Sequence, residues 1–220
     1  MSSPYLKPGF YDQALEKGKH RDIVGGRWDE TGFVQMAALI DEGLEPEHRL
    51  LDIGCGCLRL GHLAVNWLDS GHYWGTDASG PLMQRGWEVE LSPAAQARLP
   101  REQLVEDASF SYAGVPQDID YAIAFGVFAH LPAEMLRPAL ISARKHLTSL
   151  QKLLFTVFIA PEGHAGAYRQ KDGVVTHPHR PPYHRYRADV EADAEAAGFA
   201  VSWRTRVLPR GQDLCVLEPI

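Results

Sequence analysis

The stretch RLLDIGCGCLRLGHLAVNWLDSGHYWGTD, residues 49–77, contains the pattern that decides the fold. A short apolar run ends on the acid Asp52, and a glycine-rich turn, GCG, follows it directly. Residues 58–70 then place apolar side chains at helical spacing, and a second short run ends on the acid Asp77. This order predicts a strand, a tight turn, a helix and a second strand.

The same alternation of strand-like and helix-like runs extends on both sides of this stretch. The expected strands are residues 49–54, 72–77, 101–107, 118–128, 152–160, 199–208 and 212–220. The expected helices are residues 30–44, 58–70, 80–92, 132–147 and 186–198. The turn signal PRG joins the last two strands as a hairpin. We therefore expect an α/β fold: a doubly wound, Rossmann-like, mostly parallel seven-stranded sheet with a C-terminal antiparallel hairpin.

The sequence also indicates how the chain is organised around this sheet. Residues 1–45 read as an N-terminal arm followed by a cap helix, and residues 46–220 as the sheet domain. Residues 160–186 show no periodicity and are rich in proline and glycine, histidine and tyrosine. A segment of that length between a strand and a helix is typically functional or disordered. We expect it to be a lid over the carboxyl edge of the sheet.

Composition excludes several classes of protein. The chain has 220 residues, a net charge of −6 and 45% hydrophobic residues, which is ordinary for one globular domain. The acidic balance argues against a nucleic-acid partner. There is no run of 18 apolar residues and no apolar core near the first residue, so we expect no membrane span and no secretory signal. Three cysteines with no such signal predict free thiols and a cytoplasmic location.

The glycine turn between two acids predicts a ligand site at the carboxyl ends of the strands. Gly54 and Gly56 permit a positive φ and a close approach of a ligand to the backbone. A dinucleotide prefers G-x-G-x-x-G, but the sixth position here is Arg59. S-adenosylmethionine has no pyrophosphate; its methionine carboxylate suits the turn and the helix start, and its ribose diol suits a carboxylate such as Asp77.

At these residues the chain resembles the class I S-adenosylmethionine-dependent methyltransferases, of the small bacterial type that acts on small molecules. LLDIGCG is similar to their first motif, YWGTDAS to their second, VEDASF to the adenine-contacting acid, and DYAIAFGVFAHL to their fourth motif. The resemblance covers residues 48–160. One departure is Leu58, where the family often has a third glycine.

The resemblance implies S-adenosyl-L-methionine as the cofactor and methyl transfer to an oxygen or nitrogen of a small-molecule acceptor. The residues it places at the cofactor are Asp52, Gly54, Cys55, Gly56, Asp77, Ala78, Met83, Asp107, Ala108 and Phe125. Arg27, in the segment VGGRW, is either a cap residue near the methionine carboxylate or part of a plain surface turn.

A base is needed only where the acceptor must lose a proton. The candidates after the fourth and fifth strands are His130, His177, His179, His184 and Tyr183, with His164 and Tyr168 nearby. A neutral imidazole is the active form, so turnover is expected to fall on acidification near pH 6.5 (roughly the unperturbed pKa). The run HPHRPPYH has metal-ligand residues but no flanking acid, so no metal is expected.

Two alternatives stay open. The first is a non-catalytic S-adenosylmethionine-binding or interaction protein on the same fold. The second is another alkyl transfer from a sulfonium, such as aminopropyl transfer, although the fourth strand is followed by FGVF rather than by the paired acids that such a reaction needs. The sequence assigns no oligomeric state.

Overall fold

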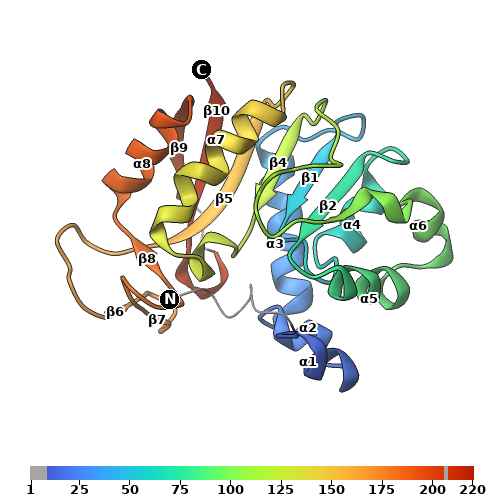
Figure 1. The fold of residues 1–220 in the computed structure, drawn as a ribbon, viewed down its shortest axis with the longest axis horizontal. Coiled ribbons are helices and arrows are strands. Elements are labelled where there is room, and N and C mark those ends of the chain that lie inside the picture. The colour runs from blue at the N-terminus through green and yellow to red at the C-terminus, as the bar shows by residue number, and fades with distance from the viewer. Residues whose placement is uncertain (1–8, 206–207) are drawn as a thin grey trace.

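A computed structural model describes residues 9–205 and 208–220 of the chain. Its main sheet has the order β3-β2-β1-β4-β5-β10-β9, and the short strand β8 pairs with the end of β5 (Figure 1). The strands of this sheet are β1 (Leu50–Ile53), β2 (Tyr73–Asp77), β3 (Leu104–Glu106), β4 (Tyr121–Ala124), β5 (Lys152–Ile159), β8 (His184–Arg185), β9 (Phe199–Arg204) and β10 (Asp213–Pro219).

The direction of the strands follows the expected pattern. Strands β1 to β5 run parallel, and β10 is antiparallel to both β5 and β9. The doubly wound, mostly parallel sheet with a C-terminal antiparallel hairpin is therefore confirmed. In the register of the sheet, Asp52 lies between Gly75 of β2 and Ile123 of β4, so the first acid occupies the centre of the sheet.

Helices cover both faces of the sheet (Figure 1). One face carries α3 (Trp28–Asp41), α4 (Gly61–Trp67), α5 (Gly80–Glu90) and α6 (Pro93–Arg98). The other face carries α7 (Leu136–His146) and α8 (Arg187–Ala196). Short 3-10 turns lie at Arg101–Gln103, Phe128–His130, Ala133–Met135 and Pro209–Gly211. None of the helices in the described ranges is long and apolar enough to cross a membrane.

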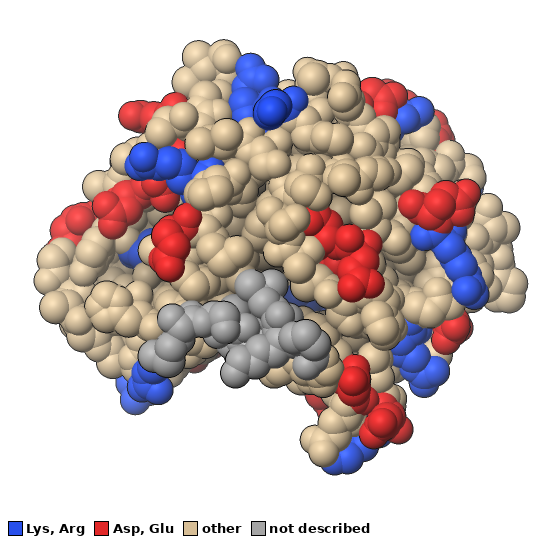
Figure 2. All heavy atoms as spheres, viewed as in Figure 1, with Lys and Arg blue, Asp and Glu red and all other residues tan. Residues whose placement is uncertain are grey.

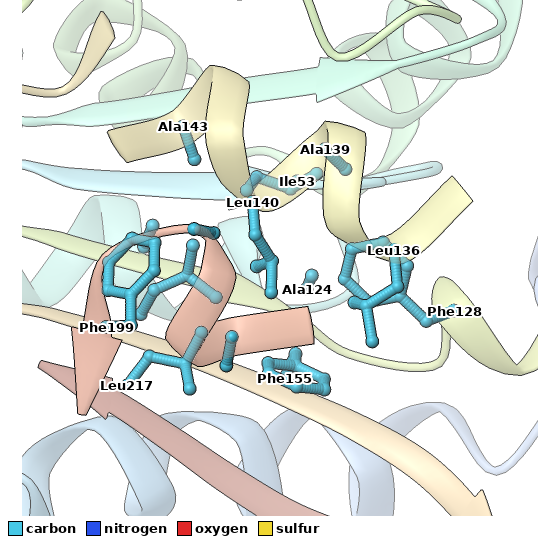
Figure 3. Close-up of a cluster of buried hydrophobic side chains, with 14 of the residues drawn as sticks. Ile53, Ala124, Phe128, Leu136, Ala139, Leu140, Ala143, Phe155, Phe199 and Leu217 are labelled. Carbon is cyan, nitrogen blue, oxygen red and sulfur yellow. The ribbon is translucent and has the colours of Figure 1, made fainter. Parts of the chain in front are cut away.

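The two faces divide the apolar side chains of each strand between two cores. In β1, Leu51 and Ile53 belong to the core under α7 and α8, whereas Leu50 belongs to the core on the α3 side. This follows from the period of two along a strand, and burial on both faces explains why β1 reads as an unbroken apolar run. Figure 3 shows Leu136 and Leu140 of α7 pointing onto the sheet.

Serines fix the starts of two helices that follow strands or loops. The Ser79 hydroxyl accepts a hydrogen bond from Leu82 N at 3.3 Å, and Ser92 accepts one from Ala95 N at 3.2 Å. Each serine is followed by a proline within the first helical turn, where the missing N–H has no intrahelical partner in any case. The first of these helices, α5, begins at Gly80, three residues after Asp77.

Some sequence expectations about local structure are wrong. The third strand begins only at Leu104 because a 3-10 turn precedes it, and the fourth ends at Ala124 because Gly126 has a φ of +74°. The N-terminal arm contains two short helices, α1 (Asp12–Glu16) and α2 (His20–Ile23). The strand expected at residues 199–208 ends at Arg204, and residues 206–207 lie outside the described part.

Residues 160–186 also have more regular structure than their composition predicts. Strands β6 (Tyr168–Arg169) and β7 (Val175–Thr176) form an antiparallel pair, and β8 continues the main sheet beside β5.

On the face shown in Figure 2, the described basic and acidic side chains alternate in small groups.

Candidate functional site

A cavity of about 300 Å³ opens at the carboxyl ends of the parallel strands. It is lined by ten of the residues that the sequence singles out: Asp52, Gly54, Cys55, Gly56, Asp77, Ala78, Asp107, Ala108, Phe125 and His130. They come from the ends of β1, β2, β3 and β4, which meet at one edge of the sheet. This is the position at which open α/β sheets bind ligands.

The glycine turn after β1 is shaped by positive φ angles. Gly54 has a φ of +71° and Gly56 of +56°. A Cβ built on Gly54 would lie 2.5 Å from Val127 Cγ2, and one on Gly56 would lie 3.0 Å from Val24 Cγ1. Both the backbone conformation and the space therefore require glycine at these two positions.

Leu58 occupies the place of the third glycine and keeps its backbone conformation. Its φ is +66°, and its side chain is completely buried. A left-handed conformation costs a non-glycine residue roughly 1–2 kcal/mol. Burial of the leucine side chain contributes a similar amount, about 1.5–3 kcal/mol, and offsets this cost. Leu58 therefore adopts the left-handed backbone conformation that a glycine would adopt without strain.

Asp77 lies at the end of β2 with both carboxylate oxygens turned to backbone amides. Oδ2 accepts a hydrogen bond from Gly56 N at 2.9 Å, and Oδ1 accepts one from Ser79 N at 3.0 Å. Burial raises the pKa of Asp77 to about 6, against the lowering effect of these backbone donors. Each oxygen keeps a further lone pair, so the carboxylate can still accept from hydroxyl groups of a ligand.

Asp52 is more deeply buried than Asp77 and has few stabilising contacts. Its Oδ2 accepts a hydrogen bond from the Tyr73 hydroxyl at 2.8 Å. Burial raises its pKa to about 7, while the Tyr73 hydrogen bond and the charge of Arg59 act in the opposite direction. A carboxyl group with a pKa this high lacks an adequate cationic partner and would be stabilised by one from a ligand.

Asp107 follows β3 and lies beside Asp77 in the sheet edge. Its backbone N donates to Asp77 O at 2.9 Å. Its carboxylate accepts from Ser109 N at 2.9 Å and from Tyr112 N at 2.7 Å, which folds the following loop around it. Burial raises its pKa, but the Tyr112 and Ser109 donors outweigh this effect, and the pKa lies below its usual value. Asp107 is therefore ionised.

His130 lies at the wall of the cavity in the 3-10 turn after β4. Burial, with the nearby charge of Arg210, lowers its pKa to about 4. The imidazole is therefore neutral at pH 7, as expected, but the expected loss of activity near pH 6.5 is not what this environment predicts. Protonation of His130 belongs near pH 4.

A buried arginine from residues 160–186 holds the turn that carries His130. The Arg185 guanidinium donates to the carbonyl oxygens of Ala133 at 2.7 Å and Pro132 at 3.1 Å, and also approaches that of Leu131 at 3.3 Å. Burial lowers its pKa to about 10, so it stays charged at neutral pH. Arg185 of β8 thus fixes the position of residues 131–133, which directly follow His130.

The other candidates for the acceptor site lie outside the cavity lining. Tyr183 is buried, and its backbone N donates to Ala129 O at 2.7 Å. His184 is buried, and its Nδ1 lies 2.9 Å from the Thr176 hydroxyl. The backbone of His177 bonds to that of residues 182 and 184, and His179 is exposed. These side chains were expected at the cavity. They lie elsewhere because β7 and β8 are joined by contacts of Thr176 with His184 and of His177 with Tyr183.

Two predicted cofactor residues also lie elsewhere. Met83 is 2% exposed and packs in the core on the α3 side, and its neighbour Leu82 reaches the cavity instead. Arg27 adopts a φ of +47° and forms an ion pair with Asp172 at 3.1 Å, in a separate hollow. Arg27 therefore does not line the cavity at the sheet edge.

Sequence analysis missed Arg59 as a cavity residue. Its Nη1 donates to the carbonyl oxygens of Val24 at 3.0 Å and Gly26 at 3.3 Å, and so ties the N-terminal segment to the turn. Its Nε is buried without a hydrogen-bond partner among the described residues. Burial also lowers the pKa of Arg59. The position of Arg59 directly after the glycine turn is the signal in the sequence that points to this role.

Arg210 and Gln212, from the connection between β9 and β10, also line the cavity. The Arg210 Nη2 donates to Gly25 O, and the Gln212 Oε1 accepts from the Thr156 hydroxyl. Because β10 is antiparallel to β5, its first residues reach the same sheet edge as the ends of the parallel strands. The turn signal PRG predicts the hairpin between the last two strands but does not predict this placement.

Comparison with known proteins identifies the fold. The sequence matches no family profile. The structure is similar to a magnesium protoporphyrin IX methyltransferase from Synechocystis PCC 6803 with bound SAH (S-adenosylhomocysteine), with a TM-score of 0.67 at 15% identity over 96% of this chain and 97% of that one. It is similar to a putative O-methyltransferase from Nostoc punctiforme, with a TM-score of 0.64 at 17% identity over 99% of this chain and 63% of that one.

A third similar structure is Streptomyces venezuelae DesVI, with a TM-score of 0.58 at 18% identity over 96% of this chain and 97% of that one. At these identities the likeness concerns the fold. The resemblance to class I methyltransferases is confirmed at that level: the chain has their Rossmann-like fold, and the same topology brings the two acids and the glycine turn to one edge.

Proposed function

We propose that this protein is an S-adenosylmethionine-dependent methyltransferase that acts on a small-molecule acceptor. The observation that carries the proposal is the pairing of Asp52 and Asp77, two buried acids with raised pKa values, around the glycine turn at the sheet edge. Such a site suits a ligand that brings positive charge and hydroxyl groups together. The magnesium protoporphyrin IX methyltransferase from Synechocystis PCC 6803, which has a similar fold, was solved both with SAM and with SAH.

In this proposal, different residues of the cavity bind different parts of the cofactor. The ribose diol belongs at Asp77, whose carboxylate keeps free lone pairs, and the adenine belongs beside Asp107 and Ala108. The amino group of the methionine end belongs at Asp52. Its carboxylate belongs at Arg59, whose buried Nε has no partner among the described residues. A charged donor and a charged acceptor would thus each gain a partner of opposite charge.

The bound cofactor supplies an activated methyl group, so the protein's part is mainly to position an acceptor. Orientation of two reactants contributes up to about 7–11 kcal/mol to such a reaction. The aromatic ring of Phe125 and the neutral imidazole of His130 line the side of the cavity next to the end of β4. With a pKa of about 4, His130 orients an acceptor by hydrogen bonding and is a weak base.

Calorimetric titration with S-adenosylhomocysteine tests the proposal directly. The wild-type protein is expected to bind it, and Asp77→Asn to bind it more weakly by roughly ten-fold or more, since a hydrogen bond to a charged group contributes about 1.5–3 kcal/mol. Asp118→Asn is the matched control, because that carboxylate is exposed and pairs with Arg49 away from the cavity. Equal affinities in wild type and Asp77→Asn would contradict the proposed site.

Tritiated S-adenosylmethionine then separates an enzyme from a binding protein. Label is expected to appear in a small-molecule acceptor, and the rate is expected to fall in Asp77→Asn in proportion to its loss of cofactor affinity. A protein that binds S-adenosylhomocysteine at Asp77 but transfers no label to any oxygen or nitrogen acceptor in a broad screen would instead be the non-catalytic alternative.

A further inference from the structure

The cavity has two chemically different halves. All the acids that line it among the described residues, Asp52, Asp77 and Asp107, follow β1, β2 and β3. The half formed by the ends of β4, β5 and the start of β10 is lined by a cation and an amide, Arg210 and Gln212, together with the neutral His130. This second half is the one left for the acceptor when the cofactor lies along the acids.

Arg210 has a charge that the described carboxylates do not neutralise. Its Nη2 donates to the uncharged carbonyl of Gly25. The nearby Asp172 accepts the Arg210 backbone N–H at 2.9 Å, but its charge is paired with Arg27 at 3.1 Å. Within the described part of the chain, no carboxylate oxygen lies within 4.0 Å of the Arg210 side-chain nitrogens. The positive charge of Arg210 acts inside the cavity, because it contributes to the lowered pKa of His130.

Gln212 is held so that its amide nitrogen is the end left for a ligand. The Thr156 hydroxyl oxygen accepts Gly126 N–H at 2.8 Å and donates its single proton to Gln212 Oε1. Thr156 is completely buried and Gln212 is 7% exposed, so this arrangement is shielded from water. Because the carbonyl end of the amide is engaged, Nε2 is the donor that remains at the cavity wall.

The walls around these two donors are apolar. Phe125 and Val127 follow β4, Phe158 belongs to β5, and Pro182 comes from the segment before β8. An acceptor that fits this half therefore combines an apolar or aromatic body with a polar group facing two hydrogen-bond donors, one of them charged. Such donors favour an anionic oxygen and disfavour an ammonium group, which would lie near the unpaired arginine.

We propose that the acceptor is an aromatic or apolar molecule with an oxyanion, a carboxylate or phenolate, which Arg210 and Gln212 hold at the methyl-transfer position. This inference rests on the proposed function and names the substrate class of the same site. In the reaction, a lone pair of the oxyanion forms the new O–C bond while the electron pair of the C–S bond stays on sulfur. The oxyanion becomes a neutral ester or ether, the sulfonium becomes a neutral thioether, and no proton leaves.

A reaction of this kind explains why the described residues place no strong base next to the acceptor half. The acids at the cavity lie along its other half, and His130 is neutral and weakly basic. A neutral amine or alcohol acceptor would need a group to take its proton. An oxyanion needs only to be bound in its ionised form, and a guanidinium provides that.

The test uses benzoate and benzylamine as probes, titrated into the wild-type protein saturated with S-adenosylhomocysteine. Benzoate is expected to bind and benzylamine to bind at least ten-fold more weakly, by roughly the strength of one charge-assisted hydrogen bond. Arg210→Gln is expected to weaken benzoate binding by a similar factor, while it keeps a donor for Gly25 O. Arg169→Gln is the matched control, because that exposed arginine also donates to a glycine carbonyl, Gly173 O at 3.1 Å, but outside the cavity.

Three results would overturn the proposal: no binding of benzoate, benzylamine binding as tightly as benzoate, or equal benzoate affinity in wild type and Arg210→Gln. The affinity for S-adenosylhomocysteine, measured first, tests the proposed function separately. If it does not bind, the proposed function fails, and the benzoate titrations are made on the free protein, where the same dependence on Arg210 is expected.

Discussion

Replacement of the most deeply buried acid, Asp52→Asn, is expected to stabilise the protein while it weakens cofactor binding. The side chain is completely buried, and burial raises its pKa from the ordinary 3.8 to about 7. At about 1.4 kcal/mol per pKa unit, ionising Asp52 in the folded protein at pH 8 costs roughly 4 kcal/mol. Asparagine has nearly the same shape and no charge, so this cost disappears in the variant.

The direction of the effect depends on pH. Below about pH 4 the Asp52 carboxyl is protonated in both the folded and the unfolded chain, and its titration costs nothing. Between pH 4 and pH 7 the unfolded chain ionises first, so the wild type loses stability as pH rises through the folded pKa of about 7. The variant does not titrate at this position. Its advantage therefore grows by about 1.4 kcal/mol per pH unit and levels off above pH 7.

The measurement is urea unfolding of wild type and Asp52→Asn at pH 4, 5, 6, 7 and 8, followed by tryptophan fluorescence. A changed hydrogen bond with Tyr73 costs the variant roughly 1 kcal/mol at every pH, so a net gain of about 3 kcal/mol is expected at pH 8. Asp118→Asn, at an exposed ion pair, should show no comparable pH-dependent gain. A difference between wild type and Asp52→Asn that does not change with pH would refute the reasoning.

Three further outcomes are expected from the same structure. The affinity for S-adenosylhomocysteine should fall as pH is lowered from 8 to 5.5, by roughly 100-fold if Asp52 and Asp77 must both be ionised in the complex; a flat calorimetric profile would contradict this. Gly54→Ala should lose about 1–3 kcal/mol of stability and most cofactor affinity, whereas Gly71→Ala, with a φ of +81° but open space, should keep its affinity in the same titration. Arg185→Met should lower the free energy of unfolding by about 2–4 kcal/mol, and with it the urea midpoint, because it leaves buried carbonyl groups without donors. An unchanged midpoint would show that water replaces the guanidinium.

Much of the fold is readable in the sequence because the strands are buried on both faces and the helices between them are amphipathic. The apolar run before Asp52 and the run at residues 152–160 identify strands without any tertiary information. The boundaries are less well defined. The strand at Tyr121–Ala124 ends early because a positive φ at Gly126 starts a 3-10 turn, and nothing in FGVF distinguishes that turn from a continued strand.

Residues 160–186 show what composition does not specify. Their prolines and histidines predict an irregular segment, whereas in the structure β8 joins the sheet beside β5, and the buried Arg185 supports the His130 turn. Pairing of a two-residue strand depends on the partner that happens to lie beside it. Local sequence does not contain that information.

The sequence by itself determined the half of the cavity that we propose for the cofactor. Asp52, Gly54, Gly56 and Asp77 lie within one strand–turn–helix–strand unit, whose geometry local rules fix almost completely. Only the tertiary structure decided the half that we propose for the acceptor. Arg210 and Gln212 reach the cavity because the last strand enters antiparallel and returns the chain to the carboxyl edge of the sheet, about 80 residues beyond His130. Contacts of that separation depend on strand order, which residue types along the chain do not specify.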